Sequence, residues 1–185
     1  MGYLLILGGA RSGKSALAVE IARRWGGPVT FIATAGADDD EMADRVARHR
    51  AERPATWRTV EEPAALLEAV RSAPSGDLLV VDCLTLWVSN LLLSGAGEIV
   101  AAAAAVAGTL AERATPAVVV SNEVGMGIVP DHPLGRAFRD ALGSVNAAFA
   151  ARAERAALLV AGRLLELTPA TRFLEGIEWP VSTRP

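Results

Sequence analysis

A glycine-rich segment near the start of the chain carries a phosphate-binding pattern. Gly8 is followed by four residues and then by Gly13, Lys14 and Ser15, which matches the Walker A motif in full. Glycines let backbone N–H groups point at phosphate oxygens, and a helix that follows directs its N-terminus at the same anion. We therefore expect Lys14 to neutralise the β- and γ-phosphates of a nucleotide and the Ser15 hydroxyl to bind Mg²⁺.

Lysine is used only once in this chain. Lys14 is the only lysine among 18 basic residues, and the other 17 are arginines. An ammonium group is a compact point charge on a flexible stem, whereas a guanidinium group is a planar fork, so the two are not interchangeable at a phosphate. A single lysine could survive anywhere by chance, but its place inside the motif favours a catalytic role.

Polar residues follow two further apolar runs. Asp82 comes directly after residues 78–81, and Asn122 and Glu123 come after residues 117–121. In open α/β sheets, ligands bind at the carboxyl ends of the strands. Asp82 is predicted to hold Mg²⁺ directly or through water, with a plain strand-ending turn residue as the alternative. The glycine-containing loop 124–130 is either a lid or substrate wall or an ordinary crossover.

His49 has two interpretations. Its spacing from Met42 and Val46 on an expected helix places it on the apolar stripe, which favours a core-facing histidine. Arg45 and Arg53 lie four residues before and after it, on the same helix face. Arginines oppose protonation of the ring and gather phosphate, so a neutral imidazole there could act as a nucleophile at phosphorus. The other histidine, His132, is expected to be a cap or surface residue, and Cys83 a small packing residue.

These residues need a scaffold of alternating strands and helices. The apolar periodicity predicts strands at 3–7, 29–34, 78–82, 117–121 and 158–161, and helices at 14–25, 40–52, 63–70, 99–113 and 134–155. Such alternation indicates an α/β fold, with a mostly parallel central sheet and helices on both faces. We expect one nucleotide-binding domain over residues 1–185, with an extended or loosely held tail from about residue 168.

The composition excludes several classes of protein. Hydrophobic residues make up 51% and charged residues 21% of the 185 residues, which argues against intrinsic disorder. The net charge of −3 gives no basic footprint for nucleic acid. One cysteine excludes a disulfide framework within the chain and fits a reducing compartment. The longest apolar stretch is split by Asp82, so no membrane span is expected, and we expect a cytoplasmic protein.

Beyond these local patterns, the chain resembles the bifunctional adenosylcobinamide kinase / adenosylcobinamide-phosphate guanylyltransferase family of cobalamin biosynthesis, over about residues 3–165. The most specific elements are Arg45-x-x-x-His49 and the stretch Asn-Glu-Val-Gly-Met-Gly-Ile-Val-Pro at 122–130. The other matching segments are 8–15, 32–34, 39–42, 53–54, 57–59, 138–140 and Asn146.

The resemblance implies a P-loop NTPase of the RecA-like type that performs two reactions. The family phosphorylates the aminopropanol hydroxyl of adenosylcobinamide with ATP or GTP. It then transfers GMP from GTP to that phosphate through a GMP bound to a histidine, which here is His49, and releases pyrophosphate. The nucleotide contacts implied for this chain are Gly8, Gly9, Ala10, Arg11, Ser12, Gly13, Lys14, Ser15, Ala33, Thr34, Ala35, Arg50, Ala51, Glu52, Arg53, Glu61 and Asp82.

The sequence departs from the family pattern at two positions. Some members have glutamate at the position of Asp82, and some have a second histidine at the position of Arg48. The family is also described as trimeric, so a homo-oligomer is expected. The competing functions are a one-step small-molecule kinase in which His49 is structural, and a nucleotide-switched regulatory module.

Overall fold

The computed structural model describes residues 2–35 and 53–175, and the structural statements below concern these residues. The predicted helix at 40–52 lies outside them. The described chain runs β1 (Tyr3–Gly8), α1 (Lys14–Trp25), β2 (Val29–Ala33), β3 (Arg58–Glu61), α3 (Leu66–Ser72), β4 (Leu78–Asp82), α4 (Leu84–Leu93), α5 (Ile99–Ala111), β5 (Ala117–Val120), α6 (Pro133–Ala150), β6 (Arg155–Val160), β7 (Arg163–Leu167) and α7 (Ala170–Leu174).

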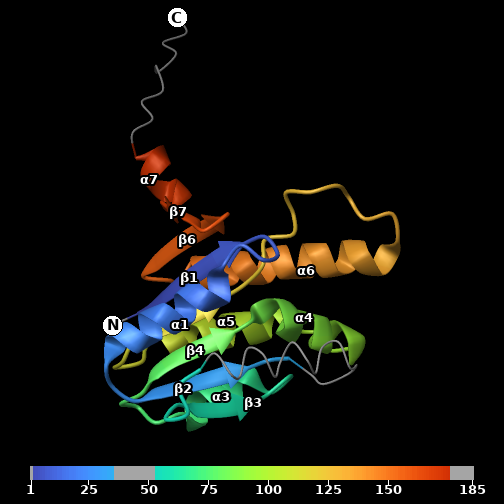
Figure 1. The fold of residues 1–185 in the computed structure, drawn as a ribbon. Helices are drawn as coiled ribbons and strands as arrows, with labels where there is room; N and C mark the ends of the chain where they lie inside the picture. Colours follow the sequence, from blue (N-terminus) through green and yellow to red (C-terminus); the bar gives the residue numbers. More distant parts are fainter. Residues whose placement is uncertain (1, 36–52, 176–185) are drawn as a thin grey trace, which may run out of the picture.

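The described strands form one mostly parallel sheet in the order β3-β2-β4-β5-β1-β6-β7 (Figure 1). Every neighbouring pair is parallel except β6 and β7, which form an antiparallel hairpin. The carboxyl ends of the parallel strands therefore meet along one edge of the sheet. The predicted α/β architecture with a mostly parallel sheet is confirmed.

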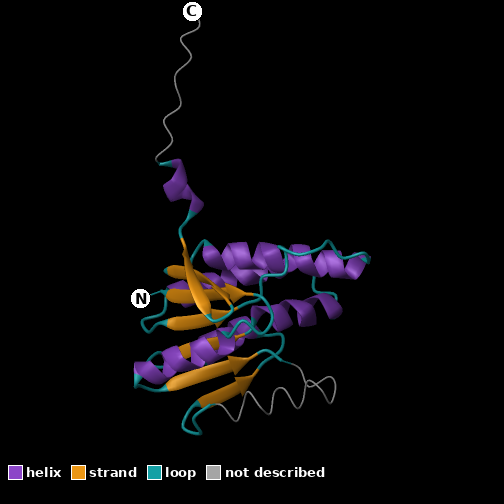
Figure 2. Cartoon of the chain, turned by 45° about the horizontal axis from the view of Figure 1, so that its top comes forward, coloured by secondary structure: helices purple, strands orange, loops and turns teal. Residues whose placement is uncertain are grey.

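Helices cover both faces of the sheet, as the alternating pattern predicts (Figure 2). On one face, Leu5, Val81 and Val119 pack with side chains from α3, α4, α5 and α6. On the other face, Ile6 and Val80 pack with side chains from α1. Because both faces are covered, the central strands read as continuous apolar runs, which is why the sequence reveals them.

The structure also contains elements that the sequence pattern did not predict. Strand β3 is short and its residues are exposed or half-buried, so it has no apolar run to mark it. Helix α4 continues an apolar run in which strand and helix cannot be told apart by periodicity. Strand β7 is an exposed edge strand, and α7 is helical where an extended tail was expected (Figure 1).

The predicted end of α6 was wrong by about five residues. The helix ends at Ala150, not at residue 155, although the alanines that follow favour helix. Arg155 instead begins β6 and pairs with Leu4 of β1. Strand pairing therefore overrides local helix propensity at this point. None of the described helices is long and apolar enough to cross a membrane.

Gly8 provides a test of how tightly the phosphate loop is packed. A Cβ atom there would lie 2.3 Å from the Leu159 carbonyl oxygen, and the φ angle of Gly8 is +154°. We expect Gly8→Ala to lower the free energy of unfolding by about 2–4 kcal/mol through overpacking and backbone strain, measured by urea denaturation.

Gly143→Ala is the matched control for this prediction. Gly143 lies within α6, and its added Cβ would meet no atom within 4 Å. We expect this change to raise the free energy of unfolding by about 0.5–1 kcal/mol, because alanine favours helix. Equal effects of the two substitutions would contradict the packing of the loop against Leu159.

Candidate active site

The phosphate loop connects the end of β1 to the start of α1. Its backbone adopts positive φ angles at Gly8, Arg11 and Gly13. Ser12 N–H donates to the Gly9 carbonyl at 3.4 Å, and the Gly162 N–H in the β6–β7 turn donates to the Ser12 carbonyl at 3.2 Å. The β6–β7 hairpin therefore supports the loop from the side. The loop geometry is that of an anion-binding cradle at a helix N-terminus.

Lys14 is held inside this cradle. It is only 6% exposed, and its Nζ donates to the Gly9 carbonyl at 2.7 Å and to Ser12 Oγ at 3.4 Å. The first turn of α1 contains no acidic side chain that would neutralise the helix N-terminus. The positive end of the helix and the Lys14 ammonium group thus lie together at the site where the motif predicts phosphate.

The predicted site residues that the structure describes lie along the same carboxyl edge. Asp82 ends β4, Ala33 ends β2 and Glu61 ends β3. Ala33 pairs with both Asp82 and Glu61 in the sheet register. Strand β5 lies between β4 and β1, so the Asp82 and Gly8 strand ends are about 10 Å apart at the usual strand spacing. The phosphate loop, Ala33, Glu61 and Asp82 are therefore brought to one edge of the sheet.

Thr34 fixes the end of β2 to the start of α4. Its buried hydroxyl donates to the Cys83 carbonyl at 2.6 Å and accepts from the Cys83 N–H at 2.9 Å. The Asn90 side-chain amide donates to the Thr34 carbonyl at 3.0 Å and to the Pro63 carbonyl at 2.9 Å. Sequence reasoning missed this role of Asn90. A polar residue within an apolar run was the available signal.

Arg53 lies beside β2. Its guanidinium carbon lies 3.5 Å from the centre of the Phe31 ring, which is a cation–π distance. Phe31 is a buried residue of β2, on the sheet face that also packs against α1. Arg53 is therefore held near the edge where Ala33 and Glu61 end their strands. His49, Arg50, Ala51 and Glu52 lie outside the described residues, so their predicted roles stay predictions.

Cys83 and His132 behave as the sequence indicates. Burial, with a smaller contribution from the Asp82 carboxylate, raises the pKa of the Cys83 thiol to about 11. The thiol is therefore protonated at neutral pH, which suits a packing residue and not a nucleophile. His132 is the N-cap of α6, where its Nδ1 accepts from the Gly135 N–H at 3.1 Å.

Asn146, one of the residues that match the family pattern, uses its side-chain amide inside the protein. The residue is 5% exposed. Its Oδ1 accepts from Ser121 Oγ at 2.6 Å, and its Nδ2 donates to the Asn122 carbonyl at 3.0 Å. These bonds tie α6 to the end of β5. Asn146 therefore positions the segment that leads into Glu123.

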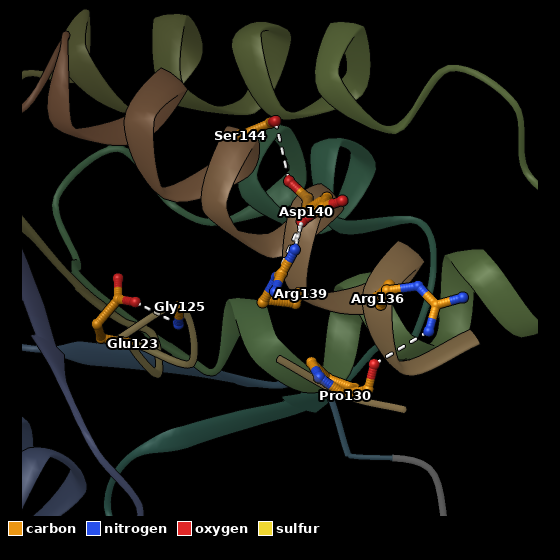
Figure 3. Close-up of polar contacts among 7 residues, drawn as sticks. All are labelled: Glu123, Gly125, Pro130, Arg136, Arg139, Asp140 and Ser144. Carbon is orange, nitrogen blue, oxygen red and sulfur yellow. Dashed lines mark hydrogen bonds and ion pairs between the residues drawn. The ribbon is translucent and has the colours of Figure 1, made fainter. Parts of the chain in front are cut away.

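The loop that follows β5 is exposed and apolar. Figure 3 shows Glu123 and Gly125 at its strand end and Pro130 beside Arg136 at its helix end. A carboxylate oxygen of Glu123 accepts from the Gly125 N–H at 2.5 Å, and Arg136 donates to the Pro130 carbonyl at 3.0 Å. Between these two fixed ends, Ile128 is 97% exposed.

Thr34 provides a test of how the edge is positioned. Thr34→Val removes the hydroxyl and leaves the buried N–H and C=O groups of Cys83 without their partner. We expect a loss of about 1–3 kcal/mol in the free energy of unfolding, together with weaker nucleotide binding because Asp82 shifts. Urea denaturation and nucleotide titration measure the two effects. Thr34→Ser keeps the hydroxyl and should keep both the stability and the nucleotide affinity of the wild type. Equal losses in Thr34→Val and Thr34→Ser would contradict the proposed role of the hydroxyl in positioning the edge.

Comparison with known folds identifies the architecture. The RadB recombinase has a TM-score of 0.52 at 15% identity, with 85% of this chain and 73% of that chain covered. Flagellar accessory protein FlaH from Methanocaldococcus jannaschii has a TM-score of 0.50 at 13% identity, with 88% and 74% covered. At these identities the likeness concerns the fold alone, and it agrees with the predicted RecA-like P-loop architecture.

Comparison of sequences identifies the family. The family model described as "Cobinamide kinase / cobinamide phosphate guanyltransferase" matches residues 4–167. The bifunctional adenosylcobalamin biosynthesis protein CobP of Pseudomonas aeruginosa is 49% identical over 160 residues, with 85% of this chain and 92% of that protein covered. CobU of Salmonella typhimurium, which has the same description, is 40% identical over 175 residues, with 86% and 96% covered. With its phosphate loop at the carboxyl edge of a RecA-like sheet, the chain belongs to the cobinamide kinase / cobinamide phosphate guanyltransferase family.

Proposed function

We propose that the chain phosphorylates the aminopropanol hydroxyl of adenosylcobinamide with ATP or GTP, and then transfers GMP from GTP to the new phosphate. The products of the second reaction are adenosylcobinamide-GDP and pyrophosphate. The observation that carries this proposal is the complete phosphate loop, with the buried Lys14 at its centre, in a chain matched by the family over residues 4–167. One nucleotide site at the loop serves both reactions.

The described residues suit a nucleotide-bound Mg²⁺ ion. Ser15 and Asp82 offer a hydroxyl and a carboxylate, which are oxygen ligands of the kind Mg²⁺ prefers. Residues 2–35 and 53–175 hold no cluster of three His, Cys, Asp or Glu side chains that could form an all-protein metal cage. This fits an ion held by few protein ligands together with substrate phosphates. When bound, Mg²⁺ would neutralise negative charge on the phosphates.

His49 is the proposed nucleophile of the second reaction. Its place in the Arg45-x-x-x-His49 element supports this role. The imidazole attacks the α-phosphorus of GTP, a P–N bond forms, the bond between the α-phosphorus and the bridging oxygen breaks, and pyrophosphate leaves. An oxygen of the cobinamide phosphate then attacks the same phosphorus, an O–P bond forms, the P–N bond breaks, and His49 is restored. Cobinamide phosphate and GTP are both negatively charged, so a direct attack of one on the other would be opposed by electrostatic repulsion. A neutral imidazole that attacks GTP first avoids this repulsion in the first half-reaction.

We also infer a homo-oligomer, with a trimer as the family resemblance implies. The edge strand β7 supports this inference, because Leu164 and Leu165 are 53% and 61% exposed and an apolar edge strand favours pairing with another chain. Light scattering should give about three times the 19.3 kDa chain mass. A mass of one chain at assay concentration would refute the inference.

Three variants assayed in both reactions test the proposed function. Lys14→Ala should lower both rates on the order of 10²-fold or more, because the loop works by positioning and charge stabilisation. Asp82→Asn should lower kcat more than nucleotide affinity. His49→Ala should keep phosphorylation but lose guanylyl transfer and protein labelling by GTP carrying label in its α-phosphate.

The asymmetry of His49→Ala separates a nucleophile from a core residue, whose loss would damage both reactions through unfolding. A His49→Ala enzyme that still makes adenosylcobinamide-GDP would contradict the histidine intermediate. Guanylyl transfer absent from the wild-type enzyme, with phosphorylation intact, would instead favour the one-step kinase. Near-normal phosphorylation by a folded Lys14→Ala enzyme would contradict the assignment of the phosphate loop.

A further inference from the structure

We propose that Glu123 is the general base that accepts the proton of the substrate hydroxyl in the phosphorylation step. This inference rests on the proposed kinase function and assigns a residue of the 122–130 motif whose role the sequence leaves open. The alcohol oxygen attacks the γ-phosphorus, an O–P bond forms and the bond to the β-phosphate oxygen breaks. The nucleoside diphosphate leaves, and the hydroxyl proton passes to the Glu123 carboxylate.

The backbone of Glu123 is joined to the phosphate loop. Its N–H donates to the Gly8 carbonyl at 3.1 Å. The next carbonyl along the loop, that of Gly9, accepts from Lys14 Nζ at 2.7 Å. The neighbouring carbonyls of Gly8 and Gly9 thus accept from Glu123 and from Lys14, respectively. Through these two hydrogen bonds, Glu123 is held to the same loop as the ammonium group that is expected to bind the terminal phosphates. A group that removes a proton from the attacking alcohol has to lie within reach of the γ-phosphate, and this contact keeps Glu123 beside the loop expected to bind it.

Other acids of the sheet edge are less suited to this role. Glu61 ends β3, four strands away from β1 in the sheet, which is about 19 Å at the usual strand spacing. Glu62 directly follows Glu61 and therefore lies at the same distant strand end, where its Oε1 accepts from the Ala64 and Ala65 N–H groups. Asp82 lies two strands from β1 and is the proposed magnesium ligand. Glu123 follows β5, the strand directly beside β1.

The Glu123 side chain is positioned but keeps an oxygen available. Oε1 accepts from the Gly125 N–H, which fixes the carboxylate at the start of the loop (Figure 3). Within the described part of the chain, the structure gives the other carboxylate oxygen no hydrogen bond. That oxygen can accept the proton while Oε1 holds the side chain in place.

The loop beyond Glu123 offers a surface for the acceptor. Met126, Ile128 and Val129 are 79%, 97% and 59% exposed, and they follow Glu123 within six residues. An exposed apolar segment beside a site favours contact with an apolar partner. Contact of the acceptor with this segment would bring its hydroxyl arm to the γ-phosphate from the side of Glu123.

Glu123→Gln tests the proposal because it removes the base and keeps an oxygen to accept from Gly125. With adenosylcobinamide and ATP, we expect kcat to fall about 10²-fold or more, with ATP affinity unchanged within about twofold. Guanylyl transfer to supplied adenosylcobinamide phosphate should continue at the wild-type rate, since that acceptor is already ionised and has no hydroxyl proton to lose. Glu62→Gln makes the same chemical change elsewhere on the edge and should leave both reactions unchanged.

Other outcomes overturn the proposal. Phosphorylation by Glu123→Gln within threefold of wild type would exclude a base, and equal loss of both reactions would indicate a structural role. Recovery of kcat at raised Mg²⁺ concentration would indicate a metal-holding role. A wild-type enzyme that yields neither product would refute the proposed function itself, and this inference with it. An active wild type beside an active Glu123→Gln enzyme would refute this inference alone.

Discussion

Parallel pairing of the central strands is the constraint on which the rest of the structure depends. Because β2, β4, β5 and β1 all run in the same direction, their last residues meet at one edge. Ala33, Asp82 and Gly8 are far apart in sequence, yet strand pairing brings all three to this edge. The Gly8 carbonyl, which accepts a hydrogen bond from the Glu123 N–H, also lies at this edge. The pairing of the strands thus brings the site residues together. The loops that follow the strands add the remaining residues of the site.

Burial on both faces makes this edge rigid. The Leu159 carbonyl of the neighbouring strand β6 leaves no room for a Cβ at Gly8, and the Gly162 N–H in the β6–β7 turn donates to the Ser12 carbonyl of the phosphate loop. Thr34 and Asn146 fix two of the segments at this edge through hydrogen bonds, Thr34 to Cys83 and Asn146 to Ser121 and Asn122. Chemistry that works by positioning charges around a phosphate needs this kind of fixed frame.

The predictable parts of the structure are those set by local pattern. The Walker A spacing and the apolar runs of β1, β2, β4 and β5 are visible in the sequence because buried parallel strands are apolar throughout. Strand β3 was missed because residues 58–61 are exposed or half-buried and form no apolar run, although the strand carries Glu61 to the edge. The hydrogen bonds of Thr34, Asn90 and Asn146 join residues 24 to 56 positions apart. Such pairings depend on tertiary packing, and no spacing rule reveals them.

We propose that one nucleotide site, at the phosphate loop, serves both phosphorylation and guanylyl transfer. Calorimetric titration with the α,β-methylene analogue of GTP tests it most directly, because this analogue cannot release pyrophosphate and so stays intact on the enzyme. If there is one site, we expect one molecule of the analogue to bind per chain and saturating ATP to displace it completely. Two analogues bound per chain, or binding that saturating ATP leaves unchanged, would contradict it.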